Sequence, residues 1–135
     1  MSEATNAHLY RVRVGYADTD QGGVVHHAVY LRWLEQGRVE LLRDRGVDVR
    51  TLEREERATI VVTDAELRYR QPARFDDLVD IETTVLRRGF ASILFGYRVL
   101  RDDVVLAEAK LKLACISLES GRARRWPEGM AKALA

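Results

Sequence analysis

One long segment of the sequence, from about Ala28 to Arg45, repeats its apolar residues with the period of an α-helix. Arg43 and Arg45 place positive charge in its last turn, and Gly46 follows where a helix commonly ends. Gly37 lies inside the segment and costs up to about 1 kcal/mol relative to alanine, so we expect another backbone to approach closely there. The apolar positions are Tyr30, Trp33, Leu34, Gly37, Leu41 and Leu42. They predict a helix buried on at least one side, with its aromatic residues in the core.

The rest of the sequence alternates polar and apolar residues with period two, as half-buried strands do. A first strand is predicted from Tyr10 to Tyr16, with both tyrosines on its apolar face. Four more runs follow the helix, and short turns between them predict antiparallel hairpins. These runs are Thr59 to Arg70, Leu78 to Leu86, Phe90 to Leu100 and Val104 to Leu118, and short helical turns are expected within Val47 to Arg57 and after Trp126 and Pro127. One long helix against about five strands predicts a single α+β domain over residues 1–135.

A sheet of about five strands is large for one helix, so its second face or its edge strands need cover. We therefore expect a homo-oligomer. The formal net charge is only +1, which gives no global field to attract nucleic acid. No apolar run reaches the roughly 20 residues of a membrane span, and the first ten residues lack the apolar core of a signal peptide. With Cys115 as the lone cysteine, buried in a strand, we expect a cytoplasmic protein without membrane insertion or a nucleic-acid partner.

Between the first strand and the helix lies the segment YADTDQGGVVHHAVY, residues 16–30. Gly22 and Gly23 allow the backbone to turn sharply and to approach a ligand closely. The first helical turn, near His27, leaves unpaired N–H groups at the positive end of the helix dipole. Such donors form an oxyanion hole when they point at a carbonyl oxygen. A nearby carboxylate, that of Asp20, can attack the carbonyl or activate water. The segment therefore predicts a minimal acyl-transfer site.

This segment, with Trp33, Glu35 and Arg38 after it, resembles the 4-hydroxybenzoyl-CoA thioesterase-like family. It looks closest to the branch of short-chain acyl-CoA thioesterases associated with the bacterial Tol–Pal system. The resemblance extends from Arg11 to about Pro127. It implies the hotdog fold, in which a curved antiparallel sheet wraps a long central helix. It also implies dimers or tetramers with sites between subunits, and we expect a dimer that assembles into a tetramer.

The resemblance implies that Asp20 is catalytic and that the backbone N–H of His27 polarises the thioester carbonyl. Members of the family usually carry an aromatic residue and then histidine where this chain has His26 and His27. The substitution keeps the backbone donor but changes the neighbourhood of the acyl pocket. Coenzyme A is anionic, so a chain of near-zero net charge needs a local arginine cluster to bind it. The residues expected to bind substrate or coenzyme A are Gly22, Gly23, His26, Glu35, Arg87 and Arg88.

Each of these residues also has a plain structural interpretation. Asp20 could cap a turn or the helix, and Asp18 is expected to hydrogen-bond within the loop. Glu35 could form an exposed pair with Arg38 three residues later. Adjacent histidines seldom point the same way, so the sequence predicts no metal site at His26 and His27. Arg87 and Arg88 could simply occupy an exposed hairpin turn, with Arg68, Arg70 and Arg74 as weaker candidates for coenzyme A.

The sequence predicts an acyl-CoA thioesterase that hydrolyses a short-chain or aromatic acyl-CoA without a metal or organic cofactor. One alternative is a non-catalytic hotdog module that binds acyl-CoA or acyl carrier protein, which would need no Asp20. A second is a hotdog dehydratase, which needs a histidine base paired with an acid. His27 and Glu35 fit that requirement poorly. Whether Asp20 forms a covalent anhydride or activates water stays open at this point.

Overall fold

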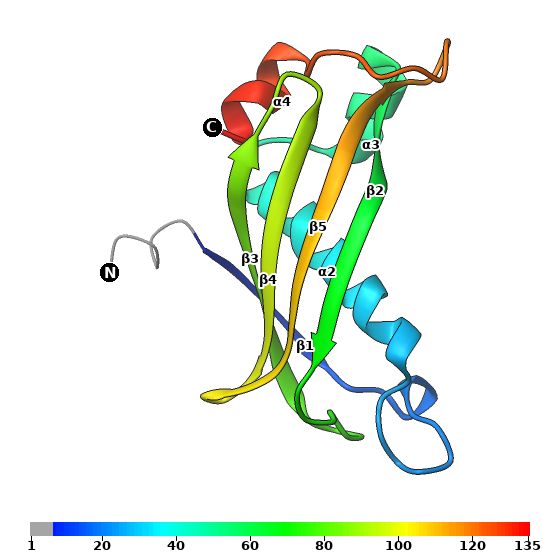
Figure 1. Ribbon diagram of the computed structural model, residues 1–135, viewed down its shortest axis with the longest axis vertical. Helices are drawn as coiled ribbons and strands as arrows, with labels where there is room; N and C mark the ends of the chain where they lie inside the picture. Colours follow the sequence, from blue (N-terminus) through cyan, green and yellow to red (C-terminus); the bar gives the residue numbers. More distant parts are fainter. Residues whose placement is uncertain (1–6) are drawn as a thin grey trace.

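The computed structural model describes residues 7–135. Residues 1–6, which belong to the predicted domain and to the segment without a signal-peptide core, lie outside the described residues. The strands form one five-stranded antiparallel sheet in the order β1-β3-β4-β5-β2, and α2 (His27–Asp44) lies along one face of it (Figure 1). The strands are β1 (His8–Arg13), β2 (Ala58–Tyr69), β3 (Leu78–Arg88), β4 (Ser92–Arg101) and β5 (Val104–Ser117). This arrangement confirms the predicted α+β class and the hotdog fold.

The buried face of α2 consists of the positions that the helical period predicts. Its buried residues are Tyr30, Trp33, Leu34, Gly37, Leu41 and Leu42. They pack on the inner face of the sheet, where Ile81, Phe95 and Leu113 are fully buried. Cys115 is buried beside them, as expected. Apolar burial on this scale is the main stabilising contribution, since each large side chain removed from water contributes about 1.5–3 kcal/mol.

The close approach at Gly37 comes from side chains of β3, not from a backbone as predicted. A Cβ atom on Gly37 would lie 2.8 Å from Ile81 Cγ2 and 2.8 Å from Thr83 Oγ1. Both neighbours are fully buried. Glycine is therefore what allows α2 to rest directly on β3.

The first strand is shorter than predicted. β1 ends at Arg13, and Tyr16 begins a 3-10 turn, η1 (Tyr16–Asp18), where its side chain is 79% exposed. The turn forms because the Asp18 carboxylate accepts the N–H of Gly15 at 2.9 Å. The prediction that Tyr16 continues the apolar face of the strand was wrong.

The connection between β2 and β3 is also not a hairpin. β2 pairs with β5 at one edge of the sheet, while β3 lies between β1 and β4. Residues 70–77 therefore cross the end of the sheet, and they are anchored on the way. The N–H groups of Arg70 and Gln71 both donate to Leu106 O, at 2.8 and 3.1 Å. Only the pairs β3–β4 and β4–β5 are hairpins as predicted.

The two short helical regions appear where the sequence places them. Asp48 caps α3 (Val49–Thr51), which continues into the π-helical turn η2 (Leu52–Glu56), and α4 (Glu128–Ala133) follows Pro127. Within residues 7–135, no helix combines the length and the apolar character that crossing a membrane requires.

Candidate active site

The segment between β1 and α2 folds into a closed loop at one end of the sheet. Thr19 and Val25 form an antiparallel bridge, and Asp20 N–H donates to Val24 O at 2.9 Å. The loop is fixed to the crossing segment because Val25 N–H donates to Ala73 O at 2.8 Å. The structure therefore brings Asp20 and the start of α2 to the same end of the molecule, shown at the bottom of Figure 1.

Asp18 anchors this loop, as the sequence suggested. Its Oδ1 accepts a hydrogen bond from Arg32 Nη2 at 2.6 Å, and its Oδ2 accepts the Gly15 N–H. Partial burial alone would raise the pKa of Asp18. The hydrogen bonds from Arg32 and Gly15 and the charge of Arg32 outweigh burial, so the pKa lies below its ordinary value.

We expect Asp18→Asn to lower the free energy of unfolding by about 1–3 kcal/mol at neutral pH, since it weakens two hydrogen bonds of a largely buried carboxylate. Because the folded-state pKa is lowered, this contribution is complete above the ordinary pKa. It is lost as the pH falls through the lowered folded-state value. Urea unfolding at pH 7 and near pH 3, with exposed Asp103→Asn as the control, measures it. Equal stability of Asp18→Asn and wild type at pH 7 would contradict the anchoring role.

Asp20 projects from the loop with its side chain exposed. One carboxylate oxygen, Oδ1, accepts the N–H of Gly22 at 2.8 Å. A Cβ atom on Gly22 would lie 3.3 Å from that oxygen, and Gly23 has a φ of +83°, which favours glycine. The two glycines thus shape the turn that orients Asp20. Within residues 7–135, no hydrogen bond or ion pair engages the second oxygen, Oδ2.

The start of α2 leaves backbone donors free. His26 precedes the first turn in an extended conformation and its side chain makes no capping bond. Its own N–H donates to Asp18 O at 2.9 Å. Within the described residues, the His27 N–H has no acceptor. This N–H stands at the positive end of an 18-residue helix. A donor placed in this way is able to serve as an oxyanion donor, and that role of His27 stays a prediction.

Two tyrosines that sequence reasoning did not assign to the site complete this end of the helix. The rings of His27 and Tyr69 lie 4.5 Å apart, and the Tyr69 hydroxyl donates to His27 O at 3.2 Å. Tyr69 also contacts Tyr30 edge to face, with ring centres 5.1 Å apart. Burial raises the pKa of both tyrosines, so their hydroxyls stay protonated. One signal for Tyr69 was present in the sequence, because Tyr69 stands in the stretch from Arg68 to Pro72, which shares the resemblance to the family.

Glu35 and Arg38 do not form the expected pair. Glu35 is exposed, and within the described residues no ion pair joins the two side chains. Glu35 lies eight residues beyond His27, about 12 Å along the helix axis. In one copy of the chain it is therefore remote from the oxyanion donor. Arg38 is half-buried and faces Tyr97 of β4.

Arg87 and Arg88 lie at the opposite end of the molecule from Asp20. They end β3, an 11-residue strand about 33 Å long that begins beside the site loop. They belong to the strand and not to the hairpin turn, contrary to the prediction. The structure thus does not bring these arginines to the site within one chain. Among the weaker candidates, Arg74 is the arginine placed at the site, because it forms a bridge with Val24 of the loop.

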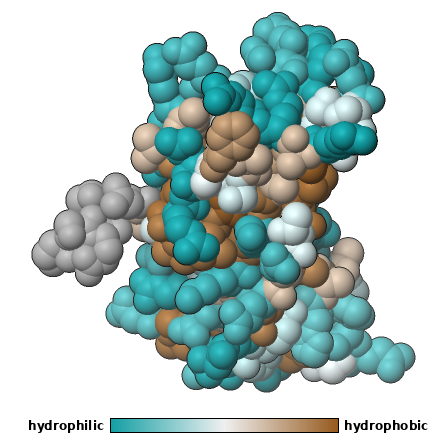
Figure 2. All heavy atoms as spheres, turned by 45° about the horizontal axis from the view of Figure 1, so that its top comes forward, coloured by the Kyte–Doolittle hydropathy of each residue, from teal (hydrophilic) through white to brown (hydrophobic). Residues whose placement is uncertain are grey.

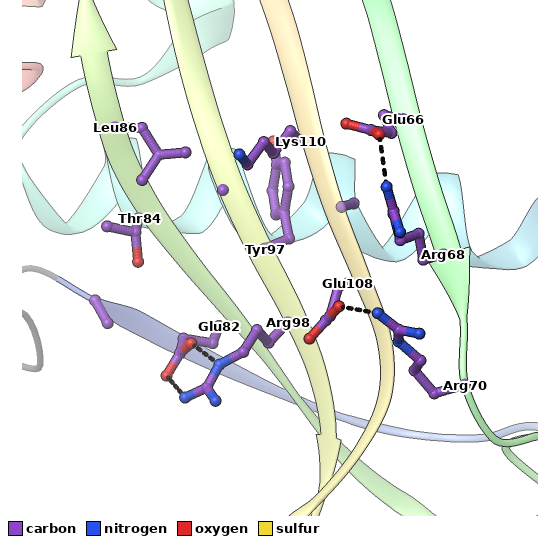
Figure 3. Close-up of a pocket in the computed structure, with 13 residues that line it drawn as sticks. Glu66, Arg68, Arg70, Glu82, Thr84, Leu86, Tyr97, Arg98, Glu108 and Lys110 are labelled. Carbon is purple, nitrogen blue, oxygen red and sulfur yellow. Dashed lines mark hydrogen bonds and ion pairs between the residues drawn. The ribbon is translucent and has the colours of Figure 1, made fainter.

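A separate hollow lies on the face of the sheet turned away from α2 (Figure 3). Ion pairs between neighbouring side chains fill it. Arg98 binds both oxygens of Glu82 at 2.6 and 3.1 Å, and Arg70 pairs with Glu108 at 2.9 Å. These arginines already have carboxylate partners, and neither Asp20 nor His27 reaches this face, so we do not assign the active site to it. Among residues 7–135, no three His, Cys, Asp or Glu side chains converge as metal ligands would.

Comparison with known proteins finds clear relatives of the whole described fold. The model of the thioesterase-like superfamily matches residues 14–134. The acyl-CoA thioesterase YbgC of Haemophilus influenzae is 41% identical over 113 residues, which cover 84% of this chain and 83% of that protein. The acyl-CoA thioester hydrolase YbgC of Escherichia coli is 34% identical over 128 residues, covering 93% and 95%. The crystal structure of a probable thioesterase from Bartonella henselae superposes with a TM-score of 0.86 at 37% identity, covering 90% and 99%.

Proposed function

The chain belongs to the thioesterase-like superfamily, and on that premise we propose that it hydrolyses short-chain or aromatic acyl-CoA to the free acid and coenzyme A. One observation carries the proposal: the loop that exposes Asp20 is tied to a helix start whose His27 N–H has no acceptor within the described residues. A thioester whose carbonyl oxygen accepts this N–H would present its carbonyl carbon to the carboxylate. The relatives named above carry the same activity in their names.

The proposed reaction uses only groups of the chain and water. The negative charge that develops on the carbonyl oxygen is stabilised by the N–H and the helix dipole, an effect of about 3–4 kcal/mol for one such donor. Asp20 either attacks the carbonyl, giving an anhydride that water cleaves, or takes a proton from the attacking water. Both routes release the thiolate of coenzyme A without a metal or organic cofactor. A cytoplasmic setting is part of the proposal.

A thiol-release assay tests this function directly. We expect turnover of butyryl-CoA or benzoyl-CoA to exceed that of palmitoyl-CoA. A parallel assay with the same acyl group on acyl carrier protein shows whether the enzyme acts on thioesters of coenzyme A or of the carrier protein. Acyl-CoA binding without thiol release would overturn the proposal and favour the non-catalytic module.

We further propose that two copies pair through β2. This strand lies at an edge of the sheet, and residues 61–66 are exposed on both of its faces. Val61 and Val62 are 40% and 44% exposed, so this unpaired edge presents two apolar side chains beside polar ones. A long unpaired edge favours pairing with another strand. Antiparallel pairing about a two-fold axis would place the site end of one copy beside the far end of the other. The expected tetramer would join two such dimers.

We expect Val62→Lys to abolish this dimer, because residue 62 lies near the middle of β2, where two new lysines would meet across the two-fold axis. Light scattering after size exclusion should show the mass fall to that of one chain. Val104→Lys, at a residue 38% exposed on β5, is the matched control and should leave the mass unchanged. A Val62→Lys protein with the wild-type mass would rule out pairing through this strand.

The same pairing would give the distant arginines a role. The loop of residues 119–126 packs on the β3–β4 turn, since Trp126 Nε1 donates to Gly89 O at 3.1 Å. It brings Arg122 and Arg124 to the end that holds Arg87 and Arg88, seen in Figure 2 as a mostly hydrophilic surface. We propose that these arginines of the second copy bind the phosphates of coenzyme A at the site of the first.

A further inference from the structure

A narrow apolar gap runs under α2 from the site end of the helix. Tyr30 and Leu34 line it from α2, and Leu67 lines it from β2. Ala107 and Ala109 of β5 leave it open, because larger side chains there would fill it. About 160 Å³ of space lies between its lining atoms, with no room for a water molecule, so an acyl chain enters it only when the lining side chains move apart.

The gap begins next to the proposed oxyanion donor. Tyr69 stands between them, in ring contact with His27 on one side and with Tyr30 on the other. Its side chain is 43% exposed and a single 3.2 Å hydrogen bond to His27 O holds it. Rotation of this ring would open the gap to an acyl chain whose carbonyl sits at the His27 N–H.

Tyr97 of β4 also lines the gap, and beside it the surroundings change from apolar to polar. Tyr97 is 3% exposed and lies directly opposite Thr83 on β3, which in turn lies opposite His8 on β1. On the other side Tyr97 lies opposite Ala109 of the gap. Four buried polar atoms lack a hydrogen-bond partner within residues 7–135, and they belong to this row and to the helix above it: His8 Nδ1, Arg38 Nη1, Thr83 Oγ1 and Tyr97 Oη.

Two of these atoms are donors beside the end of the gap. Burial raises the pKa of Tyr97 to about 12, opposed by the charge of the adjacent Arg38 and by the approach of its guanidinium to the phenol oxygen, so the phenol keeps its proton and can donate at ordinary pH. Arg38 has no acidic partner among the described residues, whereas Arg32 and Arg43 of the same helix pair with Asp18 and Glu40. Buried donors and buried charge are costly without acceptors. An oxygen placed between Arg38 and Tyr97 would satisfy both.

We propose that this gap is the acyl pocket and that Arg38 and Tyr97 bind an oxygen at the distal end of the acyl chain, a carboxylate in preference to a hydroxyl. The inference rests on the proposed function and narrows its substrates to short acyl thioesters that end in oxygen and not in a methyl group. Tyr30, Leu34 and Arg38 are each four residues apart, so they form one row along α2 from the thioester end to the oxygen end. A terminal methyl would leave both donors unpaired, which is where the selectivity arises.

The test compares three thioesters of one carbon skeleton: hexanoyl-CoA, ω-hydroxyhexanoyl-CoA and adipoyl-CoA. We expect kcat/KM for adipoyl-CoA to exceed that for hexanoyl-CoA by at least about tenfold, with the hydroxy compound between them. Arg38→Met should remove the preference and Tyr97→Phe should reduce it. Arg43→Met changes an exposed arginine of the same helix and should leave the preference unchanged.

Binding to Asp20→Asn, measured by calorimetry with the same three thioesters, separates this inference from the proposed function. A binding preference for adipoyl-CoA without turnover by the wild type would support the proposed acyl pocket and overturn the proposed hydrolysis. Equal kcat/KM for adipoyl-CoA and hexanoyl-CoA would overturn the proposed acyl pocket and support the proposed hydrolysis. If both Arg38→Met and Tyr97→Phe keep the preference for adipoyl-CoA, the proposed acyl pocket would also be overturned, since the two unpaired donors would then have only a structural role.

Discussion

Asp20→Asn should reduce thioester hydrolysis by at least about 1,000-fold while acyl-CoA binding persists. The substitution keeps the shape of the side chain and an oxygen that can accept the Gly22 N–H, so the turn over Gly22 and Gly23 should stay intact. It removes the negative charge, and with it both the nucleophile and the base. The loss affects the transition state more than the ground state, so kcat should fall far more than KM changes.

Thiol release with the preferred acyl-CoA gives the rate, and calorimetry gives the affinity. Asp44→Asn is a suitable control, because Asp44 is an exposed aspartate at the other end of α2. Its variant should turn over at the wild-type rate. If Asp20→Asn keeps more than about a tenth of the wild-type kcat, the carboxylate neither attacks nor activates water, and the reaction must rely on the oxyanion donor alone.

The helix and the strand segments could be predicted because each is encoded by neighbours in sequence. The six buried positions of α2 follow from a 3.6-residue period that tertiary contacts then satisfy. The order of the strands could not be predicted in the same way. Alternation shows that Thr59 to Arg70 is a strand but does not show which strand it pairs with. Pairing of β2 with β5 depends on the crossing of residues 70–77 and its hydrogen bonds to Leu106.

The same contrast between local and long-range contacts applies to the residues of the site. Asp20, Gly22, Gly23, His26 and His27 lie within eight consecutive residues, so a sequence motif can identify them, although their roles stay predictions. Tyr69 contacts His27 across 42 positions of sequence, and no local pattern encodes that contact. Arg87 and Arg88 show the opposite case. Their chemistry suits them to bind phosphate, so the sequence suggested them, but the length of β3 separates them from Asp20 in the same copy.

Gly37→Ala and Gly129→Ala should change stability in opposite directions, although both place the same methyl group in a helix. Helix propensity alone favours each by up to about 1 kcal/mol. At Gly129 in α4 the added Cβ atom meets nothing within 4 Å, so that gain should appear as a small rise in the free energy of unfolding.

At Gly37 the new Cβ atom would lie 2.8 Å from both Ile81 Cγ2 and Thr83 Oγ1. Both neighbours are β-branched, fully buried and fixed on β3, so neither can rotate away cheaply. Overpacking of a core costs about 1–3 kcal/mol, which should exceed the propensity gain and leave a net loss of about 1 kcal/mol. Urea unfolding of the two variants beside the wild type measures both effects. A Gly37→Ala protein as stable as Gly129→Ala would mean that α2 can move off β3 at little cost. Thr83 and Tyr97 on the sheet and Arg38 on α2 would then not be held rigidly enough relative to one another to select an acyl group.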